Sequence, residues 1–237
     1  MLRIVILSIL ALLILLGIWF YQKMATPQLD SQIQVKNLPW QIKVISPDVL
    51  HVLDLDIGQS TFGDAMSVYG DEYKLAWFEH TDKQGNTDEV SLEAYFSRVS
   101  LSGLRAKVIL ELEYNQQEVS LEYLKNNSGE PEILASHAIK YPLDDLTNKM
   151  RNQKVKSLTY VPIISIPVDI IENRFGKANK KIVINDLVEF WMYPQKGLVI
   201  MFDKKGKEAF QYVPIADYER LEEKIKLNRK SGEHIKS

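Results

Sequence analysis

The chain has 237 residues, of which 46% are hydrophobic and 25% are charged, so its composition is that of a folded protein and excludes disorder over most of its length. Its formal net charge of −2 lacks the basic surplus that a dedicated nucleic-acid binder needs to neutralise phosphates. The chain contains no cysteine, which excludes disulfides, thiolate metal sites, cysteine nucleophiles and a lipid-attachment site.

The N-terminus carries the strongest single signal. Residues 4–21 contain no charged side chain and end in the aromatic residues 19–21. At about 1.5 Å per residue, a helix of this length spans roughly 27 Å, close to the hydrocarbon thickness of a bilayer. Aromatic rings favour the headgroup level at the end of such a span. The stretch therefore predicts a transmembrane helix.

A cleaved signal peptide is the alternative, but it would have a shorter apolar core followed by a small-x-small site. Here Ala25 is the only suitable small residue, and the charged Lys23 lies close to the cut. We therefore predict an uncleaved anchor over residues 1–22, followed by a polar tether over residues 23–34.

The orientation of the anchor depends on a small basic excess. Arg3 and the amino group precede the span, whereas Lys23 and Lys36 follow it. A very short tail before a single span is the usual form of a signal anchor. This form predicts that the N-terminus stays inside and that the body is translocated.

The first half of the body, residues 35–127, is rich in strand patterns. Residues 50–57 alternate, with Leu53, Leu55 and Ile57 on one face and Asp54 and Asp56 on the other. The other predicted strands of this half are residues 40–44, 72–79, 90–98 and 104–113.

Helix signals also occur in this region. Ser60 and Thr61 are N-cap candidates for a short helix over residues 62–69, which Gly70 ends. Three further elements are predicted around the middle of the chain: helices over residues 115–126 and 144–155, and a strand over residues 133–141.

The second half, residues 128–227, follows a similar plan. A strand over residues 156–164 precedes a helix over residues 168–175, which Pro167 starts and Gly176 ends. The remaining predicted elements are strands over residues 182–185, 188–193, 198–202 and 209–213, a closing helix over residues 217–227, and a tail over residues 228–237.

Residues 52–70 align with residues 158–176 without a gap, as strand, cap region, short helix and terminal glycine. The identical pairs are Ile57/Ile163 and Gly70/Gly176. The alignment thus depends on the order of elements, and coincidence between two ordinary runs is the alternative. It predicts an α+β fold of two helix-plus-antiparallel-sheet modules, related by an internal duplication.

The second module has a pattern of known type. Its short helix ends in Phe175-Gly176, a later strand bears Trp191-x-Tyr193, and the apolar run 197–202 leads into the turn 203–207. The pattern resembles the SmpA/OmlA family of small outer-membrane assembly lipoproteins and the β-lactamase-inhibitor-type modules of similar build. The lipid-attachment cysteine of that family is missing. The proline usually found two residues after the closing glycine is replaced by Glu72 and Ala178.

The whole chain, anchor included, also resembles a set of uncharacterised proteobacterial proteins with one N-terminal span. These resemblances imply a bacterial inner-membrane protein with a periplasmic body that acts by binding another envelope protein. They imply no catalytic residues and no cofactor.

Few chemical motifs are present. The chain lacks a G-x-S-x-G elbow, G-x-G-x-x-G and G-x-x-x-x-G-K-[ST], and its four histidines have no metal-ligand spacing. Asp54 and Asp56 could do acid–base work in an envelope hydrolase if their pKa values were split. They equally suit the solvated face of a strand, as Glu111 and Glu113 do on another, and this interpretation is favoured.

Aromatic side chains are the candidate partner-binding residues, because aromatic anchors on an open sheet bind peptides and proteins. The candidates are Trp40, Trp77, Trp191 and Tyr193. Core packing is the alternative for each, since large aromatic residues are mostly buried. The leading hypothesis is therefore a non-catalytic binding protein. An inhibitor of an envelope enzyme is a variant of it.

Overall fold

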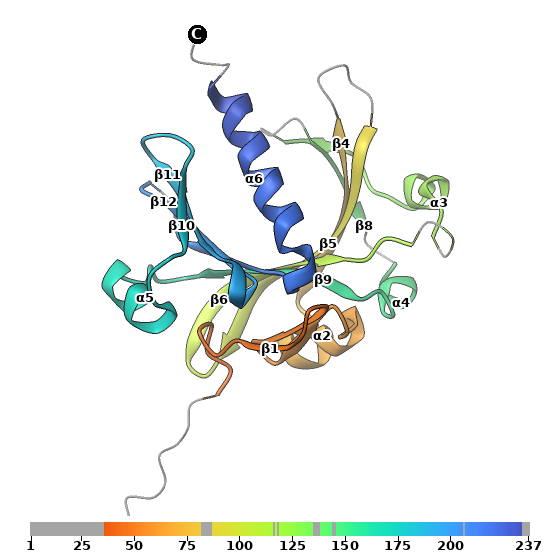
Figure 1. Cartoon of the computed structure of the whole chain (residues 1–237). Helices are drawn as coiled ribbons and strands as arrows, with labels where there is room; N and C mark the ends of the chain where they lie inside the picture. Colours follow the sequence, from red (N-terminus) through yellow and green to blue (C-terminus); the bar gives the residue numbers. More distant parts are fainter. Residues whose placement is uncertain are drawn as a thin grey trace, which may run out of the picture. The chain divides into compact units, whose positions relative to one another are not determined.

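An antiparallel ten-stranded sheet dominates the part of the chain that the computed structural model describes, residues 36–81, 87–115, 117, 119–134, 138–143, 146–205 and 207–233 (Figure 1). Its strands follow the spatial order β10 (Lys180–Val183), β11 (Val188–Tyr193), β12 (Leu198–Asp203), β13 (Ala209–Tyr212), β9 (Val155–Pro162), β6 (Leu104–Leu112), β5 (Thr87–Leu101), β4 (Tyr73–Thr81), β8 (Ile139–Leu143) and β7 (Glu132–Ile133). A smaller sheet comprises β1 (Lys43–Ser46), β2 (Val49–Val52) and β3 (Leu55–Ile57).

Two short helices begin and end where the sequence predicts. Helix α2 (Phe62–Tyr69) is capped by Thr61, whose side chain and that of Asp64 form a reciprocal capping box. Helix α5 (Val168–Phe175) follows Pro167. With a longer closing helix, α6 (Tyr218–Glu233), these elements confirm an α+β fold in which antiparallel sheet predominates.

Three elements in the middle of the chain are shorter than predicted. Helix α3 (Leu121–Asn126) starts only after its N-cap Ser120, and α4 (Thr147–Met150) is a single turn. The predicted second helix would have reached Val155, which instead starts β9 and pairs with Leu112. Pairing inside the large sheet thus overrides the local helix preference. The predicted strand over residues 133–141 is divided into β7 and β8.

The predicted single strand over residues 50–57 is wrong, because β2 and β3 form a hairpin. Val52 pairs with Leu55, and the two residues between them, Leu53 and Asp54, have φ angles of 53° and 65°. Positive φ at both central positions is the requirement of a type I′ turn, which usually shows Asn or Gly. Neither Asn nor Gly stands at positions 53 and 54, so the sequence shows only alternating apolar and polar residues and gives no signal of a turn.

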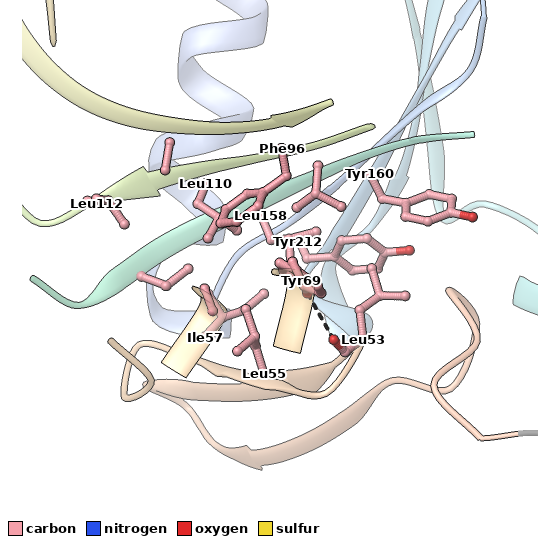
Figure 2. Packing of buried hydrophobic residues seen from close by; sticks show 14 of the residues in the cluster. Leu53, Leu55, Ile57, Tyr69, Phe96, Leu110, Leu112, Leu158, Tyr160 and Tyr212 are labelled. Carbon is pink, nitrogen blue, oxygen red and sulfur yellow. Dashed lines mark hydrogen bonds between the residues drawn. The ribbon is translucent and has the colours of Figure 1, made fainter. Parts of the chain in front are cut away.

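Apolar side chains pack on both faces of the large sheet. On one face, the β2–β3 hairpin and α2 pack against the central strands, as Figure 2 shows for Leu55, Leu110 and Leu158. On the other face, α6 packs against β10–β12 and Val213 through Tyr218 and Ile225. The sheet curves so that α6 lies on its hollow side, between the strands at the two ends (Figure 1).

The predicted modules, residues 35–127 and 128–227, contribute strands to one sheet. Strand β9 of the second half pairs with β6 of the first along its length, from Ala106–Pro162 to Leu112–Val155. Residues Lys36–Ser237 group as one compact unit. The strand before α2 belongs to the small sheet and the strand before α5 to the large one, so the aligned segments occupy different positions in the fold.

Within the described part of the chain, no helix combines the length and the apolar character needed to cross a bilayer. The predicted anchor over residues 1–22 and the tether over residues 23–34 lie outside the described residues. Their assignment stays a prediction.

Candidate functional site

A cavity of about 550 Å³ lies on the hollow face of the sheet, over β4, β5 and β8. Its lining includes the largely apolar side chains of Ala76, Phe78, Tyr95, Ile109, Leu134 and Pro142. This volume and this composition are typical of ligand-binding cavities. We call this the β4–β5–β8 cavity.

Strand register explains why these side chains share one face. Directly paired residues of an antiparallel sheet point to the same side, and alternate residues along a strand do too. Ala76 pairs with both Pro142 and Glu93, and Tyr95 pairs with Ile109. The row that starts at Tyr95 continues across the sheet to Val199, which packs against α6. The cavity and α6 therefore occupy the same face of the sheet.

Glu93 is the charged group on the floor of this cavity. Burial, and to a smaller extent the negative charge of Glu111, its direct neighbour on β6, together raise the pKa of its carboxyl to about 7. A carboxyl with a perturbed pKa inside an apolar cavity is a common mark of a functional site. Such a group can exist in either protonation state near neutral pH.

Glu111, the neighbour of Glu93, is already paired. The amino group of Lys156 lies 2.6 Å from one of its carboxylate oxygens, and the hydroxyl of Ser157 donates to the other at 3.1 Å. Both charged side chains are about three-quarters buried. Glu111 therefore has local compensation for its charge.

Two polar cavities continue along the same face toward the start of α6. One, of about 630 Å³, is lined by Glu113, Tyr114, Lys156 and Arg220 among others. The other, of about 70 Å³, is lined by Glu111 as well as by Lys156 and Arg220. The hollow face is thus apolar over β4 and β8 and charged where β6 and β9 meet α6.

The structure places three of the four predicted partner-binding residues in the core. Trp77, Trp191 and Tyr193 are all 3% exposed or less, which agrees with the packing alternative. The Trp77 ring stacks on Tyr141 at 4.0 Å, and its indole N–H donates to the Ser128 hydroxyl at 2.7 Å. These three side chains offer no surface to a partner.

Trp40 is the exception, as it is only half-buried. Its ring lies 5.0 Å from the guanidinium of Arg174 on α5, a cation–π contact. Trp40 lies outside the β4–β5–β8 cavity, so the structure does not bring the four predicted residues together.

The two carboxylates of the hydrolase hypothesis have different partners. Asp54 is exposed on the β2–β3 turn, where it accepts a hydrogen bond from the Asn37 amide, and Asp56 lies 2.6 Å from the Nδ1 atom of His51 on the paired strand. Neither aspartate lines the cavities described above. The predicted single strand that placed both aspartates on one face is instead the β2–β3 hairpin.

Histidines give no indication of a metal centre in the described residues. His51 pairs with Asp56, and His80 lies 3.3 Å from the Ser91 hydroxyl, while His137 and His234 fall outside the described part. Among the residues that the structure describes, no group of histidine and carboxylate side chains is placed to hold a metal ion.

Sequence reasoning missed Glu93. It lies within the predicted strand over residues 90–98, among polar residues that alternate as a solvated face does. Its proximity to Glu111 follows from the β5–β6 register, which a single sequence does not show. Comparison of the chain with models of protein families, with curated proteins and with solved structures gives no match.

Proposed function

We propose that this chain is a membrane-anchored, non-catalytic binding protein of the bacterial envelope, and that the β4–β5–β8 cavity holds a segment of another envelope protein. The observation that carries the proposal is the cavity itself. It is large and lined mainly by apolar side chains, and it lies on the same face of the sheet as α6.

Half-exposed apolar side chains favour a protein ligand. Phe78, Tyr95, Ile109 and Pro142 are each partly exposed in the cavity and would be covered by a bound segment. Burial of apolar area contributes roughly 25 cal/mol per Å². Aromatic residues in such a position act as anchors for protein ligands.

Anchoring would assist this function. The predicted span over residues 4–21 would hold the body near other membrane proteins, in the bacterial inner membrane with the body in the periplasm. Confinement raises the effective concentration of a partner without any new contact. The resemblance of the second half to SmpA/OmlA modules, which act by binding, agrees with this role.

Photo-crosslinking in intact cells tests the proposal. A photoreactive amino acid replaces Phe78 in the cavity, and in a second variant it replaces Val183, which is 53% exposed on the far edge strand β10. We expect an envelope protein to be captured from position 78 and not from position 183. Mass spectrometry of the product identifies the captured segment.

A cavity-filling substitution supplies the matched control. Ala76 is 6% exposed and faces the cavity, so Ala76→Phe should occupy part of the space and abolish capture from position 78. Circular dichroism verifies that the variant is folded. Equal capture from positions 78 and 183, or capture unaffected by Ala76→Phe, would contradict the proposal. A reporter fused to the C-terminus tests the predicted orientation.

A further inference from the structure

The inference concerns the ligand chemistry of the β4–β5–β8 cavity and rests on the function proposed above. Glu93 lies on the cavity floor among apolar side chains. Within the described residues, no side chain donates a hydrogen bond to its carboxylate, and no lysine, arginine or histidine lies within 4 Å of it. Partly burying a carboxylate without a counter-charge is costly, so a cation supplied by a ligand would stabilise its charged form.

Among the described residues, the cationic side chains around Glu93 do not provide this counter-charge. Glu111 is the direct neighbour of Glu93 and is compensated by Lys156 at 2.6 Å. Across the cavity, Lys140 pairs with Glu132 at 3.1 Å. Lys74 is exposed and belongs to the next row of the face, where it pairs with Tyr95. The cations Arg220 and Lys224 of α6 line the polar cavities on the other side of Glu111.

We propose that the β4–β5–β8 cavity binds a basic side chain, a lysine or an arginine, from an extended segment of a partner protein, and that Glu93 is the group that recognises its charge. The methylene stem of the basic side chain lies along Phe78, Tyr95 and Ile109. Its cationic end meets Glu93 on the floor.

Long basic side chains suit this cavity because they combine two chemistries. Lysine and arginine bury an aliphatic stem against apolar surface and keep the charge at the tip. A segment with a neutral or acidic residue at this position would leave Glu93 buried without a counter-charge, which disfavours its binding. The carboxyl pKa of about 7 agrees with a carboxylate that lacks such a partner in the free protein.

Two synthetic peptides test this specificity on the full chain in detergent micelles. Both are fluorescently labelled octapeptides of alternating valine and threonine, and they differ at one central residue, which is lysine in one and norleucine in the other. Norleucine keeps the aliphatic stem and lacks the ammonium group. Dissociation constants are measured by fluorescence anisotropy at pH 8, where Glu93 is ionised. The variants are Glu93→Gln and, as a control with the same change in net charge, Glu130→Gln on an exposed loop.

We expect the unmodified chain and Glu130→Gln to bind the lysine peptide at least tenfold more tightly than the norleucine peptide. In Glu93→Gln the ratio should fall to twofold or less, with the norleucine affinity unchanged. Equal affinities in the unmodified chain, a ratio that survives Glu93→Gln, or no binding of either peptide would overturn the inference. The cellular crosslink from position 78 tests occupancy by a protein separately, so failure of the proposed function is distinguishable from failure of this charge preference.

Discussion

The phenol hydroxyl of Tyr69 donates a hydrogen bond of 2.9 Å to the backbone carbonyl oxygen of Leu53, and both residues are buried (Figure 2). Leu53 has a φ of 53°, a conformation that costs an ordinary L-residue roughly 1–2 kcal/mol. The contact joins the end of α2 to the turn of the β2–β3 hairpin. It thus helps to hold a turn whose own residues disfavour it.

Removing this hydroxyl should destabilise the protein. Tyr69→Phe leaves the Leu53 carbonyl buried without its donor, and we expect a loss of about 1–3 kcal/mol in the free energy of unfolding. Denaturant unfolding of the full chain in detergent, followed by circular dichroism, measures it. Tyr95→Phe is the matched control, because Tyr95 lies half-exposed in the cavity. Equal effects of the two substitutions would contradict this account.

Two glycines with positive φ should respond differently to alanine. A Cβ at Gly197 would lie 2.2 Å from the carbonyl oxygen of Val213, whereas a Cβ at Gly103 would meet nothing within 4 Å. Gly103→Ala should therefore cost only the backbone term, about 1–2 kcal/mol. Gly197→Ala must also displace the backbone at Val213, just after β13, and we expect about 3 kcal/mol or more, as in overpacked cores. The same unfolding experiment compares them, and similar costs would show that the close approach at Gly197 relaxes freely.

Glu93 should make stability depend on pH. The pKa of its carboxyl is about 7 in the folded protein, above the usual value of 4.5. Its contribution to the free energy of unfolding is therefore fully present below pH 4.5 and is lost as the pH rises through 7. A pKa difference of one between the folded and unfolded states corresponds to about 1.4 kcal/mol of stability, and the partial exposure of Glu93 reduces the total. Glu93→Gln should therefore be more stable than the unmodified chain by about 1–2 kcal/mol at pH 8. We expect no such gain at pH 4.5.

Unfolding curves of Glu93→Gln and the unmodified chain at the two pH values measure this difference in stability, with Glu130→Gln as the control. A gain that is the same at both pH values would show that the effect comes from packing and not from the charge of Glu93. Carboxyl NMR titration provides a direct reading of its pKa.

The buried tryptophans should behave as structural residues. Trp77→Ala and Trp191→Ala remove core side chains that are 0% and 3% exposed, and each should cost about 3–5 kcal/mol. Trp40→Ala removes a half-buried ring and should cost less than half as much. Thermal unfolding of the three variants gives the order. A stable, folded Trp191→Ala variant that had lost partner capture would instead assign Trp191 to a binding surface.

The agreement between sequence and structure follows the range of the interactions involved. Helices α2 and α5 were predictable to the residue because their starts and ends depend on neighbours, such as Thr61 and Gly70. The bounds of strand β11 also agree with the prediction. The turn at Leu53 and Asp54 was missed because tertiary contacts, including that with Tyr69, hold residues that do not favour it.

The candidate site was beyond sequence reasoning for a different reason. Alternation shows that a strand has two faces but not what covers each one. Both faces of the large sheet are covered over part of their area, so Trp77 and Trp191 pack inside while Phe78 lines a cavity. The pairing of Glu93 with Glu111 depends on register between strands. Local patterns contain neither kind of information.

Strand β13 lies between β12 and β9 and is the last strand in the part of the chain that the structure describes. The hydroxyl of Tyr212 within it donates to the carbonyl of Pro39, 173 positions earlier. Contact order is therefore high, and folding is expected to be slow. During synthesis, this edge of β9 stays open until residues 209–212 have emerged. Because unpaired edges are prone to aggregation, the nascent chain has a long period in which a chaperone would protect it.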